Sequence, residues 1–139
     1  MTPEQMHAAI KARLETLIPT DLAAVYSGRV PDDPPALADG RVKPYAVLWG
    51  SPGSSNPGAE DLCGEVDGAY LAVPRVTVAA GDPDWCLAAT TAARDSLSRW
   101  QPAPEAERLR DDGFDPAMLE DEDVNPRRWF TPLQFRTAA

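Results

Sequence analysis

The chain has 139 residues, with 13 Lys and Arg against 22 Asp and Glu, and its formal net charge is −9. This length suits a single domain over residues 1–139 that buries a core, and the negative charge disfavours simple binding to a phosphate backbone. No apolar run reaches the roughly 20 residues of a membrane helix, and the first residues do not resemble a signal peptide, so we expect synthesis in a cytoplasm-like setting and no membrane partner.

The N-terminal segment carries the signals of a helix start. Thr2, Pro3 and Gln5 supply an N-cap, a proline at the first helical position and a capping-box partner. Apolar residues then recur at intervals of three and four as far as Leu17, after which a proline stops the pattern. The sequence predicts an amphipathic helix here, then a short strand within residues 21–31 and an exposed connection.

The middle of the chain is predicted to form two strands separated by a long loop. Residues 45–49 are apolar at nearly every position, which is typical of a central strand buried on both faces. Residues 51–68 are rich in Pro, Gly, Ser and Asn, and loops of this length often bind partners or become ordered on assembly. Residues 69–81 form the next predicted strand, in which Pro74 indicates an edge position or a bulge.

Residues 75–100 read as a strand, a glycine turn and a helix, which is the local plan of many phosphate sites. Only Gly81 is present at the turn, whereas dinucleotide and P-loop motifs need several glycines. Asp82 caps the helix and Asp84 adds negative charge to its first turn, where a phosphate would be repelled. We therefore predict a capped helix without a phosphate site. Its expected apolar face comprises Trp85, Ala89, Ala92, Ala93, Leu97 and Trp100.

The C-terminal part is predicted to be an acidic connection followed by a closing strand. Residues 104–126 are polar and acidic, with at most one helical turn around residues 116–119. Residues 127–136 have the composition of a strand. The whole pattern predicts an α+β, sandwich-like fold in which two main helices flank a mixed or antiparallel sheet, with long loops.

Catalytic and metal-binding motifs are not recognisable in the sequence. His7 is the sole histidine and has no cysteine or carboxylate at ligand spacing, which favours a surface or boundary residue. The acids of residues 111–123 lack the alternation of a calcium loop, and the loop serines lack a nucleophile elbow. Cys63 and Cys86 are too few for a disulfide scaffold, so we expect free thiols. We expect no enzyme activity, no cofactor and no bound metal.

The four tryptophans are mostly expected in the core, because each lies on a predicted strand or helix stripe. Trp129 is the first candidate for an interface anchor, since it follows Arg127 and Arg128 and since Trp and Arg are enriched in interface hot spots.

In order and type, these elements resemble the tail terminator proteins of long-tailed, siphovirus-type bacteriophages that infect actinobacteria. The resemblance spans nearly the whole chain, and it is carried by "PYAVLWGSPG", by "TVAAGDPDWCLAATTAARDSL" over residues 77–97 and by "RWFTPLQFR". It implies an α/β fold and six copies in a ring on the head-proximal end of the tail tube, in the neck region of the virion. Such a ring stops tube polymerisation and presents a surface for the head connector.

The implied partners are further copies of the chain in a homo-hexamer, the tail tube protein and the head–tail connector protein. DNA would pass through an acidic ring lumen without specific binding. We expect interface contacts from residues 51–60 and 111–123, and pairing of Arg127 and Arg128 with acids across a subunit boundary. The alternative is that the loops are solvated and the arginines pair within the chain. The candidate interface residues are Ser51, Ser54, Asn56, Glu60, Asp111, Asp112, Arg127, Arg128 and Trp129.

Two other functions stay open at this point. One is a different neck or head-completion protein, which a copy number other than six, or a place in the head, would distinguish from a terminator. The other is a small enzyme or ligand-binding domain that uses the acidic residues, which predicts a concave pocket with convergent polar groups and perturbed pKa values.

Overall fold

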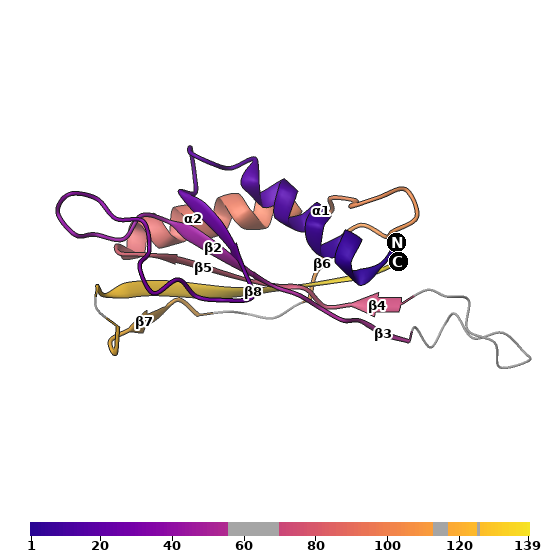
Figure 1. Ribbon diagram of the computed structural model, residues 1–139. Coiled ribbons are helices and arrows are strands. Elements are labelled where there is room, and N and C mark those ends of the chain that lie inside the picture. Colours follow the sequence, from indigo (N-terminus) through magenta and orange to yellow (C-terminus); the bar gives the residue numbers. More distant parts are fainter. Residues whose placement is uncertain (56–69, 113–116, 125) are drawn as a thin grey trace, which may run out of the picture.

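The computed structural model describes residues 1–55, 70–112, 117–124 and 126–139, in which two helices lie on the same face of a mixed β-sheet (Figure 1). The helices are α1 (Pro3–Glu15) and α2 (Pro83–Leu97). The strands are β1 (Ala24–Ser27), β2 (Tyr45–Trp49), β3 (Ser54–Ser55), β4 (Tyr70–Ala72), β5 (Arg75–Ala80), β6 (Arg110–Asp111), β7 (Leu119–Asp121) and β8 (Arg128–Ala138). The predicted α+β class is confirmed.

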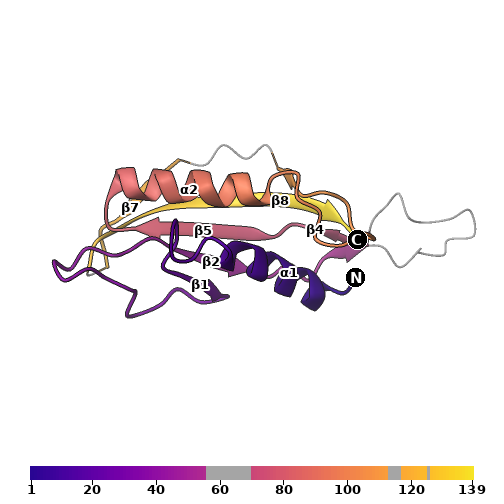
Figure 2. The same cartoon turned by 90° about the horizontal axis from the view of Figure 1, so that it is seen from above.

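The sheet has the strand order β1-β2-β5-β8-β4-β3. Both β5 and β4 pair with one edge of β8, and β6 and β7 pair with its other edge. β1 and β2 are parallel, whereas every other pairing is antiparallel. Seen from above, α1 lies along the β1–β2 side and α2 along β5 and β8, and the two chain ends lie close together (Figure 2). The predicted central position of β2 is confirmed.

Strands β4 and β5 pair with one continuous stretch of β8 and are separated at Pro74. Ala72 aligns with Thr137 and Arg75 with Gln134, so the register is the same on both sides of the break. Pro74 still accepts a hydrogen bond at its carbonyl from the Phe135 N–H, at 3.0 Å. The predicted interruption is confirmed as a gap between two strands, which suits a residue without an N–H to donate.

Both helices begin where the sequence predicts. The Thr2 hydroxyl accepts from the Gln5 N–H at 3.2 Å, and the Gln5 side chain accepts from the Thr2 N–H at 2.9 Å, which completes the capping box. The Asp82 carboxylate accepts from the Asp84 and Trp85 N–H groups at 2.9 and 3.2 Å. The turn before α2 is therefore occupied by its own cap, as predicted.

The core lies mainly between the helices and the sheet. α1 contributes Met6, Ile10 and Leu14, and these pack with residues of β2, β5, β8 and α2. The opposite face of the sheet carries a smaller cluster of its own, in which half-buried aromatic side chains surround fully buried residues. The buried members of that second cluster are Val42, Tyr45, Val47 and Ala79.

Two details of the predicted core are wrong. Ala89, Ala93 and Leu97 are buried on α2 as predicted, but the buried face also includes Cys86 and Thr90, while Trp85 is half-buried. All four tryptophans are half-buried instead of mostly core residues. Their amphipathic rings lie at the ends of elements, where the rings of Trp85 and Trp100 contact Arg41 and Arg13 at 6.0 and 5.5 Å.

The acidic connection contains strand pairing that the sequence did not indicate. At most one helical turn was predicted around residues 116–119; Leu119 begins β7, and residues 113–116 lie outside the described residues. β6 and β7 use the edge of β8 that faces away from β5, so backbone groups of that edge gain partners.

Gly81 allows the segment before β2 to pack against the turn into α2. A Cβ atom at this position would lie 2.6 Å from the backbone nitrogen of Val42, and the Gly81 N–H donates to the Val42 carbonyl at 2.9 Å. The glycine is therefore explained by close backbone packing. Neither helix in the described ranges has the length and apolar character needed to cross a membrane.

Candidate subunit interface

The loop residues of the predicted interface lie near the junction of β2 and β3. Ser51 is half-buried, and its hydroxyl accepts a hydrogen bond from the Val73 N–H at 3.0 Å, so it connects two segments of its own chain. Ser54 is exposed and begins β3. Asn56 and Glu60 lie outside the described residues.

The acidic pair Asp111–Asp112 lies on and beside β6, against the far part of β8. One carboxylate oxygen of Asp112 is 2.8 Å from Arg136 Nη2, and the other accepts from the Gln134 side-chain amide. Asp111 is exposed and lies 3.8 Å from the Arg94 guanidinium. Both acids thus have cationic neighbours within the chain.

Arg127 is at the opposite end of β8, with most of its side chain in solvent. Its Nε lies 2.9 Å from Glu120, whose side chain is mostly buried. An exposed arginine paired in this way contributes about 0–1 kcal/mol to stability. Pairing across a subunit boundary remains a prediction, and the described chain shows that Arg127 also has an internal partner.

Arg128, the next residue, is only 4% exposed. Its Nη1 donates to the Tyr45 hydroxyl at 2.9 Å and to the Pro31 carbonyl at 3.2 Å, while its buried Nε–H has no partner among the described residues. Burial raises the pKa of Tyr45, and the hydrogen bond from Arg128 opposes this effect. Tyr45 is therefore protonated at neutral pH and acts as a hydrogen-bonding group.

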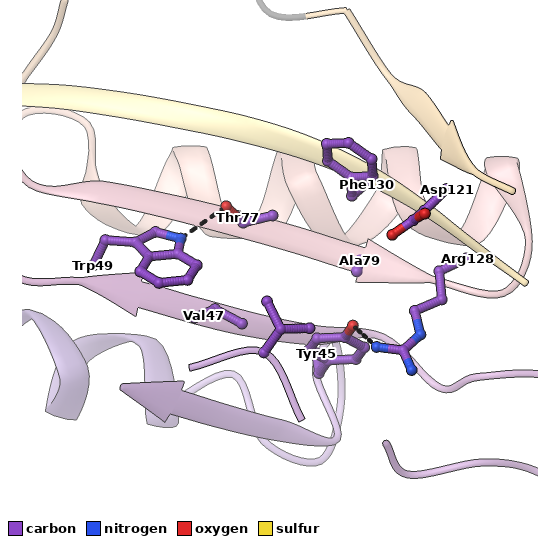
Figure 3. Close-up of a pocket in the computed structure, with 9 residues that line it drawn as sticks. Tyr45, Val47, Trp49, Thr77, Ala79, Asp121, Arg128 and Phe130 are labelled. Atoms are coloured by element: carbon purple, nitrogen blue, oxygen red, sulfur yellow. Dashed lines mark hydrogen bonds between the residues drawn. The ribbon is translucent and has the colours of Figure 1, made fainter. Parts of the chain in front are cut away.

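A cavity of about 270 Å³ opens beside this pair, on the sheet face opposite the helices. Trp49 lies at one end and Arg128 and Asp121 at the other, with Phe130 along the wall (Figure 3). The Trp49 indole N–H donates to the Thr77 hydroxyl at 3.0 Å, which fixes its ring against the sheet. The remaining lining residues are Val30, Tyr45, Val47 and Ala79.

The ionisable side chains that line the cavity are Tyr45, Asp121 and Arg128. Burial raises the pKa of Tyr45, so its phenol forms hydrogen bonds as a neutral group. His7 lies elsewhere, half-buried, with its Nε2 3.1 Å from the Ser27 hydroxyl. Within the described residues, no group of three or more His, Cys, Asp and Glu side chains is placed to hold a metal ion.

The predicted interface residues are therefore divided between separate parts of the sheet. Arg127, Arg128 and Trp129 lie at one end of β8, whereas the acids of β6 lie towards the other. Tyr45, Trp49 and Phe130 were not predicted as cavity residues. Their signal was the alternation of strand side chains, because Tyr45, Val47 and Trp49 are spaced two apart.

The fold and the cavity define a small α+β protein with a cavity on the open face of its sheet. The sequence matches no protein-family model and no curated protein. Its structure is similar to a chain in the virion of a native gene transfer agent particle, with a TM-score of 0.56 and 18% sequence identity. The match covers 95% of this chain and 92% of that chain, so it extends over the whole fold.

Proposed function

We propose that this protein is a structural component of a phage-like virion, and specifically a tail terminator that closes as a six-membered ring on the head-proximal end of the tail tube. The observation that carries the proposal is the match to a chain of a gene transfer agent virion, because it covers nearly all of both chains. The sequence resemblance of residues 77–97 and of β8 to tail terminators supports the finer role.

In this role the protein is not an enzyme. It binds neighbouring copies, the tail tube protein and the head–tail connector protein, and DNA passes through the ring without being held. A closed ring needs two different patches on each subunit. The open sheet face carries the cavity, whereas the outer side of α2 exposes Asp84, Leu87 and Asp95, and two unlike surfaces are compatible with such heterologous contacts.

The test is the molar mass of the purified protein by light scattering over a concentration series, first alone and then with preformed tail tubes, followed by imaging of the tube ends. We expect six-fold rings, or added density at one end of each tube that stops further tube growth. Tubes incubated without the protein are the control. A persistent monomer that leaves tube ends unchanged would overturn the proposal.

The same experiment separates the terminator from another neck or head-completion protein. A ring of twelve copies, or binding to the head in place of the tube, would favour that alternative. Assembly can require high concentration through mass action, so the series extends to the highest attainable concentration.

A further inference from the structure

The open sheet face presents an apolar surface that neither helix covers (Figure 1). Trp49 and Phe130 are half-buried there and line the cavity of about 270 Å³. Val30, at the mouth of the cavity, is 45% exposed, and Leu119 is 51% exposed. Leu119 points to the same side because it lies two residues before the cavity residue Asp121 on β7. Aromatic and aliphatic side chains gathered in this way are typical of the core of a protein interface.

Two arginines flank this apolar surface. Arg128 is buried at one end and retains an unpartnered Nε–H among the described residues. Arg75 is exposed near the other end, and it faces the same side as the cavity residues Thr77 and Ala79 because all three alternate along β5. Measured along the strands, Arg75 and Arg128 are roughly 20 Å apart, because each strand residue adds about 3.3 Å. Asp121 lies beside Arg128 at the buried end, so the surface favours an occupant with an apolar centre and an acid at the Arg75 end.

The outer side of α2 has that composition. Leu87 is 50% exposed, and the neighbouring exposed positions one turn apart are Asp84, Thr91 and Asp95. The two aspartates are roughly 16 Å apart at the helical rise of 1.5 Å per residue, on either side of Leu87, so one of them can approach Arg75 while Leu87 lies at the cavity. A leucine also fits a cavity of about 270 Å³.

We propose that the open sheet face binds the outer side of α2 of a second copy of this chain, with Leu87 of that copy at the cavity and its Asp84 or Asp95 near Arg75. The net charge of −9 makes most surfaces of a second copy acidic, so a face that carries an exposed arginine is electrostatically favoured. The contact joins different faces of the two copies, so the pair keeps one free face of each kind. Such a contact extends into a ring, and in this respect the inference rests on the proposed function.

Cross-linking between engineered cysteines tests the contact directly. All variants carry Cys63→Ser, which leaves the buried Cys86 as the native thiol. Val30→Cys combined with Leu87→Cys, treated with a short bismaleimide, is expected to give a ladder of covalent multimers and not merely dimers. Val30→Cys combined with Ile18→Cys is the matched control, since Ile18 is also exposed, at 37%, but lies outside α2. No ladder with Leu87, or an equal ladder with Ile18, would overturn the inference.

Charge reversal provides a second measurement that does not depend on a cysteine. Arg75→Glu places a like charge opposite the acidic helix, and it is expected to raise the concentration for half-assembly roughly tenfold, the size expected for one surface charge pair converted to repulsion. Asp84→Arg or Asp95→Arg in the same chain is expected to restore assembly. If neither reversal restores assembly, or if Arg75→Glu assembles normally, the contact is wrong.

The two proposals can fail independently. Capped tube ends without a ladder from the Val30 and Leu87 variant would overturn this contact and leave the terminator function standing. A ladder from a protein that ignores tube ends would support the contact and overturn the terminator function.

Discussion

Arg127 and Arg128 are adjacent in the sequence and have opposite environments. The side chains of consecutive strand residues point to opposite sides, so Arg127 is exposed beside Glu120 while Arg128 is buried against Tyr45. From the sequence alone, both arginines were predicted to pair across a subunit boundary. Only the strand register and the position of residues before β2 distinguish them, and neither can be derived from local composition.

Cys86 is expected to be an unreactive thiol in the folded protein. It is buried on the inner face of α2, and burial is the main cause that raises its pKa. The thiolate is the reactive form, so a Cys63→Ser variant should react slowly with a chromogenic disulfide reagent at pH 8 and rapidly in guanidinium chloride.

The sign of the accompanying pH effect follows from the same shift. A raised pKa in the folded state means that the unfolded thiol, near pKa 8.5, loses its proton first as the pH rises. The contribution of Cys86 to stability is therefore complete below that pH and decreases above it. Fast labelling of the folded variant at pH 8 would contradict this assignment.

At the scale of elements, the two helices could be predicted closely and the short strands could not. Thr2 with Gln5, and Asp82 with Pro83, are local signals that fix a helix start within a few residues. β6 and β7 exist because they pair with β8, and their sequences carry no strong alternation. Cys86 and Thr90 were not predicted on the buried face of α2 for a similar reason, because small alanines on several sides of the helix leave the limits of that face to tertiary packing.

Asp82 should be worth about 1 kcal/mol to the protein, which is the usual value of an N-cap side chain. Asp82→Ala removes the acceptor for the Asp84 and Trp85 N–H groups, so the free energy of unfolding in a urea titration should decrease by that amount. Asp82→Asn is the matched variant, because asparagine caps about as well as aspartate. Equal stability of the alanine and asparagine variants would show that the cap contributes little.

At the scale of the whole molecule, the sheet has one face built into the core and one face with a cavity. Sequence patterns predicted the first, because helix stripes and apolar strands are visible in one dimension. The cavity combines side chains from β2, β5, β7, β8 and the segment that contains Val30, which are far apart in the sequence. The cavity depends on the order of the strands in the sheet, and local sequence patterns do not predict that order.

The negative net charge of the protein predicts that it does not retain duplex DNA. With a net charge of −9, we expect no shift of a labelled duplex at physiological salt, even at concentrations where ordinary non-specific binders, with dissociation constants of about 10⁻⁴–10⁻⁶ M, would bind. The measurement is fluorescence anisotropy with the wild type and with the Asp95→Arg variant, whose charge is less negative. Binding by the wild type that weakens steeply with added salt would contradict free passage of DNA.

The position of β8 also has a kinetic consequence. It pairs with β4 and β5 on one edge and with β6 and β7 on the other, and α2 is inserted in the sequence between β5 and β8. The pairs Ala80–Trp129 and Arg75–Gln134 therefore join segments that are separated in the sequence by α2 and the connection after it. The entropy cost of closing such a long loop comes before the favourable free energy of the contacts between the strands. Folding is therefore slower. Chains that have formed both helices but have not yet inserted β8 would expose the edge of β5, and this interval is the time at which newly made copies are most prone to aggregate.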